Sequence, residues 1–291
     1  MKTVIPSELE IKDLHQILVG SVAPRPIALV STISSDGVPN IAPYSFFNVF
    51  GSNPPTAVFS SVRNLRSGTA KDTLVNIEEN RECVIHVVSY DIVYQTALAS
   101  VNYPAEVSEF AKAGFTPIPS EVVKPPRAKE SPVHFECKVK DIYSLGDHGG
   151  AGSLIICNIE RIHLAEHIFD AEGKIDPSKI DLTGRLGRAF YSRSNGDSVF
   201  PLLRPRNIMG MGFDGLPDFI KSSTVLTANN LAQLAACDLM PEPDSAIQQD
   251  AEVMNALAGN VQDREKRLHL YAKELLDKNE VDKAWQVLMV E

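Results

Sequence analysis

SVAPRPIALVSTISSDGVPNIAPYSFFN, residues 21–48, carries the strongest structural signal in the chain. Its β-branched run Ile27–Ile33 predicts a strand, the turn residues 35–37 follow, and a second strand is expected from Val38. The Asp-Gly pair suits a tight turn because glycine accepts a positive φ without strain. Small and hydroxylated residues then stand beside aromatic ones in 42–48, a composition that lets backbone amides and a hydroxyl approach a flat polar ring. The stretch therefore predicts a hairpin that leads into a binding segment.

A second informative segment is SSVRNLRSGTAKDTLVNI, residues 60–77. Between residues 60 and 73, three cations (Arg63, Arg66 and Lys71) face a single acidic residue, Asp72, in a chain whose formal net charge is -9. A helix is expected from about residue 74, capped by Asp72 or Thr73, and its N–H groups and positive dipole end would face a phosphate. The alternative is a solvated loop followed by an ordinary capped helix.

Taken together, the hairpin and the KDT-x-x-NI string at 71–77 resemble the flavin reductase-like family of FMN-binding split barrels, which includes flavoredoxins and the reductase components of two-component monooxygenases. Two later segments extend the resemblance. GDHGGAG at 146–152 is similar to the family's GDH turn, and RLGRAFYSR at 185–193 is similar to its closing R-x-G-G-x-x-Y-x-R segment. Arg188 stands where the second glycine is usual, which leaves the backbone path there open. The resemblance covers roughly the first two thirds of the chain.

The resemblance implies the residues of a flavin site. Arg63, Lys71 and nearby hydroxyls would hold the phosphate, while residues of the 42–48 segment would contact the ring or the ribityl chain. The predicted flavin-binding residues are Ser31, Thr32, Ala42, Pro43, Tyr44, Ser45, Asn48, Ser60, Ser61, Arg63, Lys71 and Thr73, and no metal ligand is predicted. His148 is carried over as the candidate contact with a nicotinamide, with a glycine loop bearing an exposed histidine as the alternative.

Three further residues of the closing segment have two interpretations. Arg185, Tyr191 and Arg193 could line the flavin edge or a nucleotide phosphate, or they could be two surface arginines and a core tyrosine.

The function that the resemblance implies is an FMN-binding oxidoreductase that passes electrons from NADH or NADPH to FMN and on to an acceptor such as a monooxygenase. A homodimer is expected, because members of the family usually complete the flavin site with the neighbouring subunit. The flavin itself carries the chemistry, so no protein acid or nucleophile is required. Two alternatives stay open: a flavoredoxin-like electron carrier with tightly bound FMN, and a non-catalytic flavin-binding protein whose C-terminal helices recruit a partner.

Composition narrows the class of protein. The chain of 291 residues is 44% hydrophobic and 22% charged, which indicates a globular protein with a sizeable core. A pI near 5.3 argues against nucleic acid as a partner. Residues 1–14 lack the apolar core of a signal peptide, and no run approaches membrane-spanning length, so a cytoplasmic protein with no membrane partner is expected. The four cysteines form no Cys-x-x-Cys pair and are expected to be reduced.

The pattern along the chain predicts two domains. Residues 1–200 form the first, mainly β with crossing helices, as in a flavin reductase-like split barrel, and residues 201–291 form a helical C-terminal extension. The predicted strands are 27–33, 38–42, 56–61, 83–88, 132–144 and 153–165, and the predicted helices of the first domain are 71–80, 92–99 and 107–113. Residues 192–206 are read as a linker, and apolar residues at helical spacing predict a helical hairpin that breaks at 277–280.

Two other motifs are set aside. Gly210–Gly215 satisfies G-x-G-x-x-G, but no convincing strand precedes it and Pro217 follows, so a Rossmann fold is not expected. His163 and His167 are four residues apart without a third ligand nearby in sequence, which favours ordinary strand histidines over a metal site.

Overall fold

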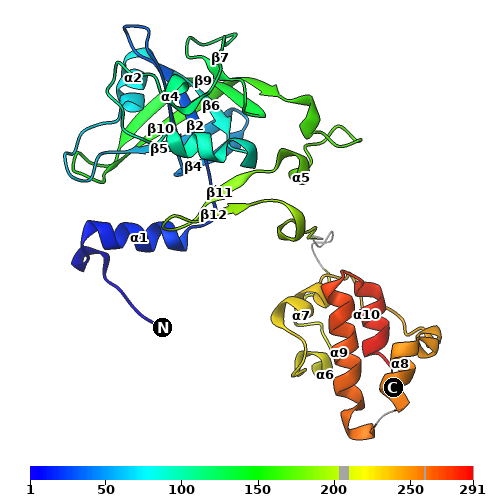
Figure 1. Ribbon diagram of the computed structural model, residues 1–291. Helices are drawn as coiled ribbons and strands as arrows, with labels where there is room; N and C mark the ends of the chain where they lie inside the picture. The colour runs from blue at the N-terminus through cyan, green and yellow to red at the C-terminus, as the bar shows by residue number, and fades with distance from the viewer. Residues whose placement is uncertain (203–209, 259, 291) are drawn as a thin grey trace. The chain divides into compact units, whose positions relative to one another are not determined.

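The computed structural model describes residues 1–202, 210–258 and 260–290, and the chain divides into two compact units, Met1–Phe200 and Pro201–Glu291. The first unit is built on a seven-stranded antiparallel sheet with the strand order β3-β2-β6-β9-β10-β5-β4 (Figure 1). Its strands are β2 (Ala28–Ile33), β3 (Pro39–Tyr44), β4 (Phe47–Ser52), β5 (Pro55–Val62), β6 (Glu82–Val87), β9 (Val133–Ser144) and β10 (Gly152–Leu164). Smaller sheets are formed by β1 (Arg25–Pro26), β11 (Thr183–Arg185) and β12 (Tyr191–Arg193), and by β7 (Pro117–Ile118) and β8 (Arg127–Ala128).

The large sheet curls around an apolar core. Alternate residues of its strands point inward, and the ring of Tyr44 at the end of β3 lies 5.2 Å from the ring of Phe59 on β5, between centroids. The backbone N–H of Ser60 also donates to the carbonyl of Phe46 at 2.8 Å. These contacts join strands from the two ends of the order, and the buried interior cluster includes Val30, Phe59, Ile77, Ile85 and Ile155.

Helices flank this sheet in the first unit, and several of them pack on its strands. They are α1 (Ile11–Ser21), α2 (Asp72–Asn80), α3 (Val93–Leu98), α4 (Glu109–Ala113) and α5 (Pro177–Ile180), with short 3-10 turns at Pro6–Glu8, Tyr90–Ile92, Glu166–Ile168 and Gly196–Ser198. Helix α2 contributes Leu74 and Ile77 to the barrel core. The predicted class, mainly β with crossing helices, is confirmed.

Three local expectations were incomplete or wrong. Helix α1 and the edge strand β4 were not predicted; in the structure α1 buries only Val19, and β4 leaves most of its side chains exposed. The predicted cap of α2, Asp72 or Thr73, was wrong, because the helix begins at Asp72 and both residues lie inside it. The N-cap position is Lys71, whose side chain makes no capping hydrogen bond. In the predicted linker, residues 192–193 belong to β12, and residues 203–206 lie outside the described residues.

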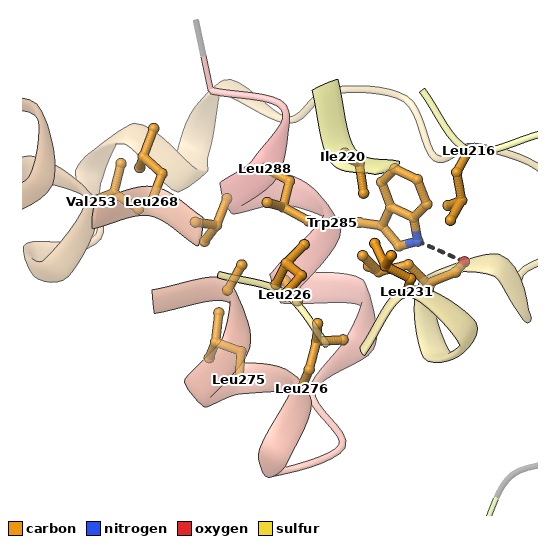
Figure 2. Close-up of a cluster of buried hydrophobic side chains, with 14 of the residues drawn as sticks. Leu216, Ile220, Leu226, Leu231, Val253, Leu268, Leu275, Leu276, Trp285 and Leu288 are labelled. Carbon is orange, nitrogen blue, oxygen red and sulfur yellow. Dashed lines mark hydrogen bonds between the residues drawn. The ribbon is translucent and has the colours of Figure 1, made fainter. Parts of the chain in front are cut away.

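The second unit is helical and has a core of its own. Its helices are α6 (Asp218–Lys221), α7 (Ala228–Ala235), α8 (Ala251–Ala258), α9 (Arg264–Asp277) and α10 (Val281–Leu288), with 3-10 turns at Ser245–Gln249 and Val261–Asp263. Figure 2 shows Trp285 of α10 among the leucines of this core, with its indole N–H donating to the carbonyl of Leu234 at 3.2 Å. The predicted hairpin is present as α9 and α10. Residues 212–215 form a turn, and residues 203–209, where a Rossmann strand would lie, are outside the described residues.

The thiols gather inside the barrel. Cys83, Cys137 and Cys157 are free and buried, and the sulfurs of Cys83 and Cys157 lie 3.9 Å apart, beyond a disulfide bond length. The prediction that these cysteines are reduced agrees with that arrangement. Among the helices of the described ranges, none is both long enough and apolar enough to cross a membrane.

A histidine cluster lies on the outer face of the sheet, beneath the connector that carries β7 and β8. The ring of His86 is fully buried: its Nε2 accepts from the N–H of Ala128 at 2.8 Å, so its Nδ1 carries the proton and donates to the carbonyl of Leu29 at 2.8 Å. His134 packs 5.1 Å away, between ring centroids. Burial lowers the pKa of His86 to about 3 and the pKa of His134 to about 4.

The neighbouring His163 is bound to a carboxylate. Its Nε2 donates to Glu136 at 2.7 Å, and this fully buried carboxylate also accepts from the N–H groups of Glu121 at 2.9 Å and Val122 at 2.7 Å. Within the described part of the chain, no group of three or more His, Cys, Asp or Glu residues is arranged to hold a metal ion. His163 lies on β10, and His167 lies in the 3-10 turn Glu166–Ile168, where it is exposed.

This cluster predicts that mild acid destabilises the first unit. The folded protein keeps His86 and His134 neutral, whereas the unfolded chain protonates them below a pKa of about 6.5. The contribution of these two neutral histidines to the free energy of unfolding is therefore complete above that pH, and it is lost as the pH falls. Between about pH 7.5 and about pH 5 the free energy of unfolding is expected to fall by about 2 kcal/mol for each histidine, as measured by urea titration.

The matched variant for this test is His86→Gln, because glutamine can keep one donor and one acceptor without titrating. Its pH-dependent loss of stability is expected to be smaller than that of the natural chain. Equal slopes for the two proteins would contradict the assignment.

Candidate functional site

Two cavities meet at Pro43, Tyr44 and Lys71. The first, of about 230 Å³, is called the α1-side cavity, and the second, of about 250 Å³, the α2-side cavity. The α1-side cavity is lined by His15, Gln16, Val19, Arg25, Pro43, Tyr44, Ser45, Phe46, Ser60, Val62, Lys71, Arg185, Leu186 and Arg188. The α2-side cavity is lined by Asn40, Ala42, Pro43, Tyr44, Asn64, Thr69, Ala70, Lys71, Asp72, Thr73, Ala99, Ser100, Val101, Asn102, Tyr103 and Glu109.

Tyr44 forms the wall between the cavities because β3 ends there and its side chain points into the barrel. The ammonium of Lys71 lies 5.4 Å from the centre of the Tyr44 ring. Burial raises the pKa of Tyr44 to about 12, with the hydroxyls of Thr73 and Ser61 close by. Within the described residues, neither the Tyr44 hydroxyl nor the Ser61 hydroxyl has a hydrogen-bond partner. Both oxygen atoms are buried, and Ser61 lines neither cavity.

The N-terminus of α2 opens on the α2-side cavity. No side chain caps this nine-residue helix, so its first N–H groups and the positive end of its dipole are free to meet an anion. Lys71 stands at the N-cap and lines both cavities. Although its side chain is largely open to solvent, partial desolvation lowers the pKa of its ammonium. The arrangement suits a phosphate group.

The turn before α2 shapes the same cavity. The side-chain oxygen of Asn64 accepts from the N–H groups of Arg66 at 2.9 Å and Ser67 at 3.2 Å, and Arg63 donates to the carbonyl of Gly68 at 3.2 Å. Asn64 and Thr69 thereby face the α2-side cavity, whereas Arg63 braces the turn and lines neither cavity.

The predicted flavin residues divide into two groups. Those that line a cavity are Ala42, Pro43, Tyr44, Ser45, Ser60, Lys71 and Thr73. Those that do not are Ser31, Thr32, Asn48, Ser61 and Arg63. Ser31 donates to the carbonyl of Pro126 at 2.5 Å, Thr32 accepts from the amides of Asn40 and Asn76, and Asn48 bonds the next backbone N–H.

His148 lies on an exposed loop outside both cavities, with its Nδ1 3.2 Å from the carboxylate of Asp147 and its side chain 91% exposed. The loop packs against the turn before α2: the N–H of Gly150 donates to Arg63 at 3.2 Å, and the N–H of Arg63 donates to Ala151 at 2.9 Å. A Cβ on Gly149 would lie 2.9 Å from the carbonyl carbon of Leu65. The glycines thus allow a close backbone contact within this chain.

Several lining residues were not predicted, above all His15 and Gln16 of α1. Arg25, 6% exposed, holds α1 in place through hydrogen bonds from its guanidinium to the carbonyls of Val22 at 2.8 Å and Leu186 at 3.2 Å. Arg25 stands two residues before the predicted strand 27–33, and the helical spacing of Ile11, Leu14 and Leu18 was the available signal for α1.

The closing segment keeps the backbone path that a glycine would take. Arg188 has a φ of 58°, in the left-handed region that favours glycine. Arg185 and Arg188 line the α1-side cavity, whereas Tyr191 and Arg193 do not. Arg193 instead pairs with Asp181 at 2.6 Å. Of the three residues with two interpretations, Arg185 therefore remains a candidate ligand contact.

Comparison with known proteins identifies related domains. Residues 19–178 match the profile of the flavin reductase like domain. The structure resembles nitrilotriacetate monooxygenase component B from Bacillus cereus, with 35% identity, a TM-score of 0.65, and coverage of 69% of this chain and 98% of that one. It also resembles 2-nitrobenzoate 2-nitroreductase NbaA from Pseudomonas fluorescens (30% identity, TM-score 0.64, 72% and 100% coverage). Flavoredoxin from Desulfovibrio vulgaris (Miyazaki F) is similar over 64% of this chain and 92% of its own, with 25% identity and a TM-score of 0.52.

Proposed function

Because this chain belongs to the flavin reductase-like family, we propose that it binds FMN where the α1-side and α2-side cavities meet and transfers electrons from NADH or NADPH to an acceptor. FMN, when bound, supplies the hydride-accepting chemistry. The protein binds and orients it. The similarity to a monooxygenase component supports a monooxygenase as the acceptor.

The observation that carries the proposal is the uncapped N-terminus of α2, which lies beside Lys71 on the α2-side cavity. The uncapped N-terminus of α2 and the ammonium of Lys71 are suited to the phosphate. Tyr44 lines both cavities and can contact the flavin. Each cavity is smaller than the roughly 300 Å³ typical of a ligand site, so a flavin with its phosphate in the α2-side cavity would extend to the shared wall at Tyr44 and Lys71.

The test is an anaerobic absorbance spectrum, recorded after reconstitution with FMN and desalting, before and after the addition of NADH and then NADPH. Retained flavin absorbance that bleaches with either nucleotide is the expected result. The second candidate, a flavoredoxin-like carrier, is supported by the flavoredoxin similarity and predicts retained absorbance that neither nucleotide bleaches. No flavin retention, together with no turnover of free FMN, would refute both.

Lys71→Ala is expected to weaken FMN binding by about 10- to 100-fold, because a charge-assisted hydrogen bond contributes about 1.5–3 kcal/mol. The measurement is a fluorescence titration of the flavin. Lys140→Ala removes the same charge from an exposed position on β9 that lines neither cavity, and its FMN affinity is expected to stay at the natural value. An unchanged titration for Lys71→Ala would refute the phosphate assignment.

We also propose a homodimer, on the evidence of an open apolar edge. Strand β4 ends the order of the large sheet, and it exposes Val49 by 50% and Phe50 by 70%. An exposed edge strand with apolar side chains is a template for pairing with another chain. A mass of two chains in light scattering is expected, and a monomer would contradict the proposal.

A further inference from the structure

The α1-side cavity has a one-sided charge. Four of its lining residues are cations, Arg25, Lys71, Arg185 and Arg188, and none is an aspartate or glutamate. The α2-side cavity, in contrast, places Asp72 and Glu109 with Lys71. A purely cationic lining is notable in a chain with a formal net charge of -9. Such a cavity attracts an anionic ligand.

Arg25 contributes a fixed positive charge to the lining of this cavity. Its guanidinium is occupied by backbone carbonyls, so it is held in one position and has no freedom to swing toward solvent. Burial lowers the pKa of Arg25, and the nearby positive charge of Arg185 lowers it further. The two arginines therefore repel each other, and an anion between them would relieve that repulsion.

Arg185 and Arg188 also line this cavity. Arg185 donates from one guanidinium nitrogen to the carbonyl of Arg188 at 2.8 Å, and its guanidinium carbon lies 4.5 Å from the centre of the Tyr191 ring. In the described part of the chain, neither arginine has a carboxylate within 4.0 Å. Both guanidiniums therefore keep N–H donors for a ligand.

Arg188 keeps its place at a cost. An arginine in the left-handed region at φ 58° is less stable than glycine there. Backbone strain of this kind is found where a side chain serves a functional site. Arg188 lines the cavity whose lining contains no aspartate or glutamate.

We propose that Arg185 and Arg188 bind a phosphate monoester of a second nucleotide, the 2′-phosphate that distinguishes NADPH from NADH. This inference rests on the proposed function, in which FMN places its own phosphate at the N-terminus of α2. Lys71 and Tyr44 line both cavities, so a ligand in the α1-side cavity adjoins the flavin. A planar guanidinium pair binds phosphate oxygens in a bidentate manner, which gives selectivity as well as affinity.

The experiment measures binding of adenosine 2′,5′-bisphosphate and of adenosine 5′-monophosphate to the FMN-reconstituted protein by calorimetry. The bisphosphate is expected to bind at least tenfold more tightly, since charge-assisted hydrogen bonds contribute about 1.5–3 kcal/mol. Equal affinities for the two nucleotides would overturn the proposal. The flavin absorbance of the same sample reports whether FMN is bound, so failure of the proposed function is seen separately.

Arg188→Gly is the decisive variant because it removes the guanidinium and also relieves the left-handed strain. It is expected to unfold at a higher temperature than the natural chain, to bind FMN with unchanged affinity, and to lose at least tenfold in affinity for the bisphosphate. Arg161→Ala is the charge-matched control, since Arg161 pairs with Glu121 and lines neither cavity. Unchanged bisphosphate affinity in Arg188→Gly would overturn the assignment. Weaker FMN binding would also overturn it, by placing the arginine at the flavin phosphate.

Discussion

Trp285→Ala is expected to unfold the helical unit, Pro201–Glu291, while the flavin-binding unit stays folded. The side chain of Trp285 is fully buried in a cluster that includes Leu216, Ile220 and Leu231 (Figure 2). Truncation removes this packing and the hydrogen bond to the carbonyl of Leu234. Replacing a buried tryptophan by alanine costs about 3–5 kcal/mol, which is comparable to the whole stability of a small domain.

The measurement combines limited proteolysis with an FMN titration. Cleavage within the helical unit is expected to accelerate strongly, and the flavin affinity is expected to stay at the natural value, because all residues lining the two cavities belong to Met1–Phe200. Leu270→Ala on α9 is the control, since that leucine is 46% exposed and its loss leaves no cavity. Simultaneous loss of FMN binding and of the helical unit would contradict the independence of the two units.

Gly149→Ala is expected to disturb the turn that precedes α2. A Cβ at this position would meet the backbone of Leu65 and lie 3.0 Å from the carbonyl oxygen of Asn64, and backbone atoms cannot move aside as a flexible side chain can. Overpacking of this kind costs about 1–3 kcal/mol. Because Asn64 lines the α2-side cavity, FMN affinity is expected to fall as well, by about tenfold.

Thermal unfolding and the flavin titration measure the two effects separately. Gly173→Ala is the matched control: its φ of 77° makes alanine strained, but the added Cβ meets nothing within 4 Å, and Gly173 lines neither cavity. It is expected to lower the melting temperature without changing FMN affinity. If Gly149→Ala leaves both quantities unchanged, the close contact between the glycine loop and the turn is refuted.

Local patterns were sufficient for part of the site. The segment 42–48 and the KDT string placed Pro43, Tyr44, Lys71 and Thr73, and each of them lines a cavity. The same patterns could not separate these residues from Thr32, whose hydroxyl is occupied by two asparagine amides inside the unit. A motif gives the type and order of residues, whereas the face on which a side chain lies depends on strand register.

The sequence by itself determined the flavin reductase-like family, the antiparallel strands and the C-terminal helical hairpin, because these follow from residue order and local periodicity. Only the tertiary structure placed α1 against the closing segment, where a Cβ on Gly187 would lie 3.0 Å from the Cα of Gly20. It also brought Arg25 together with Arg185 and Arg188 around one cavity. These contacts join residues that are far apart in the chain. They depend on how helices and strands pack together, which no local sequence pattern predicts.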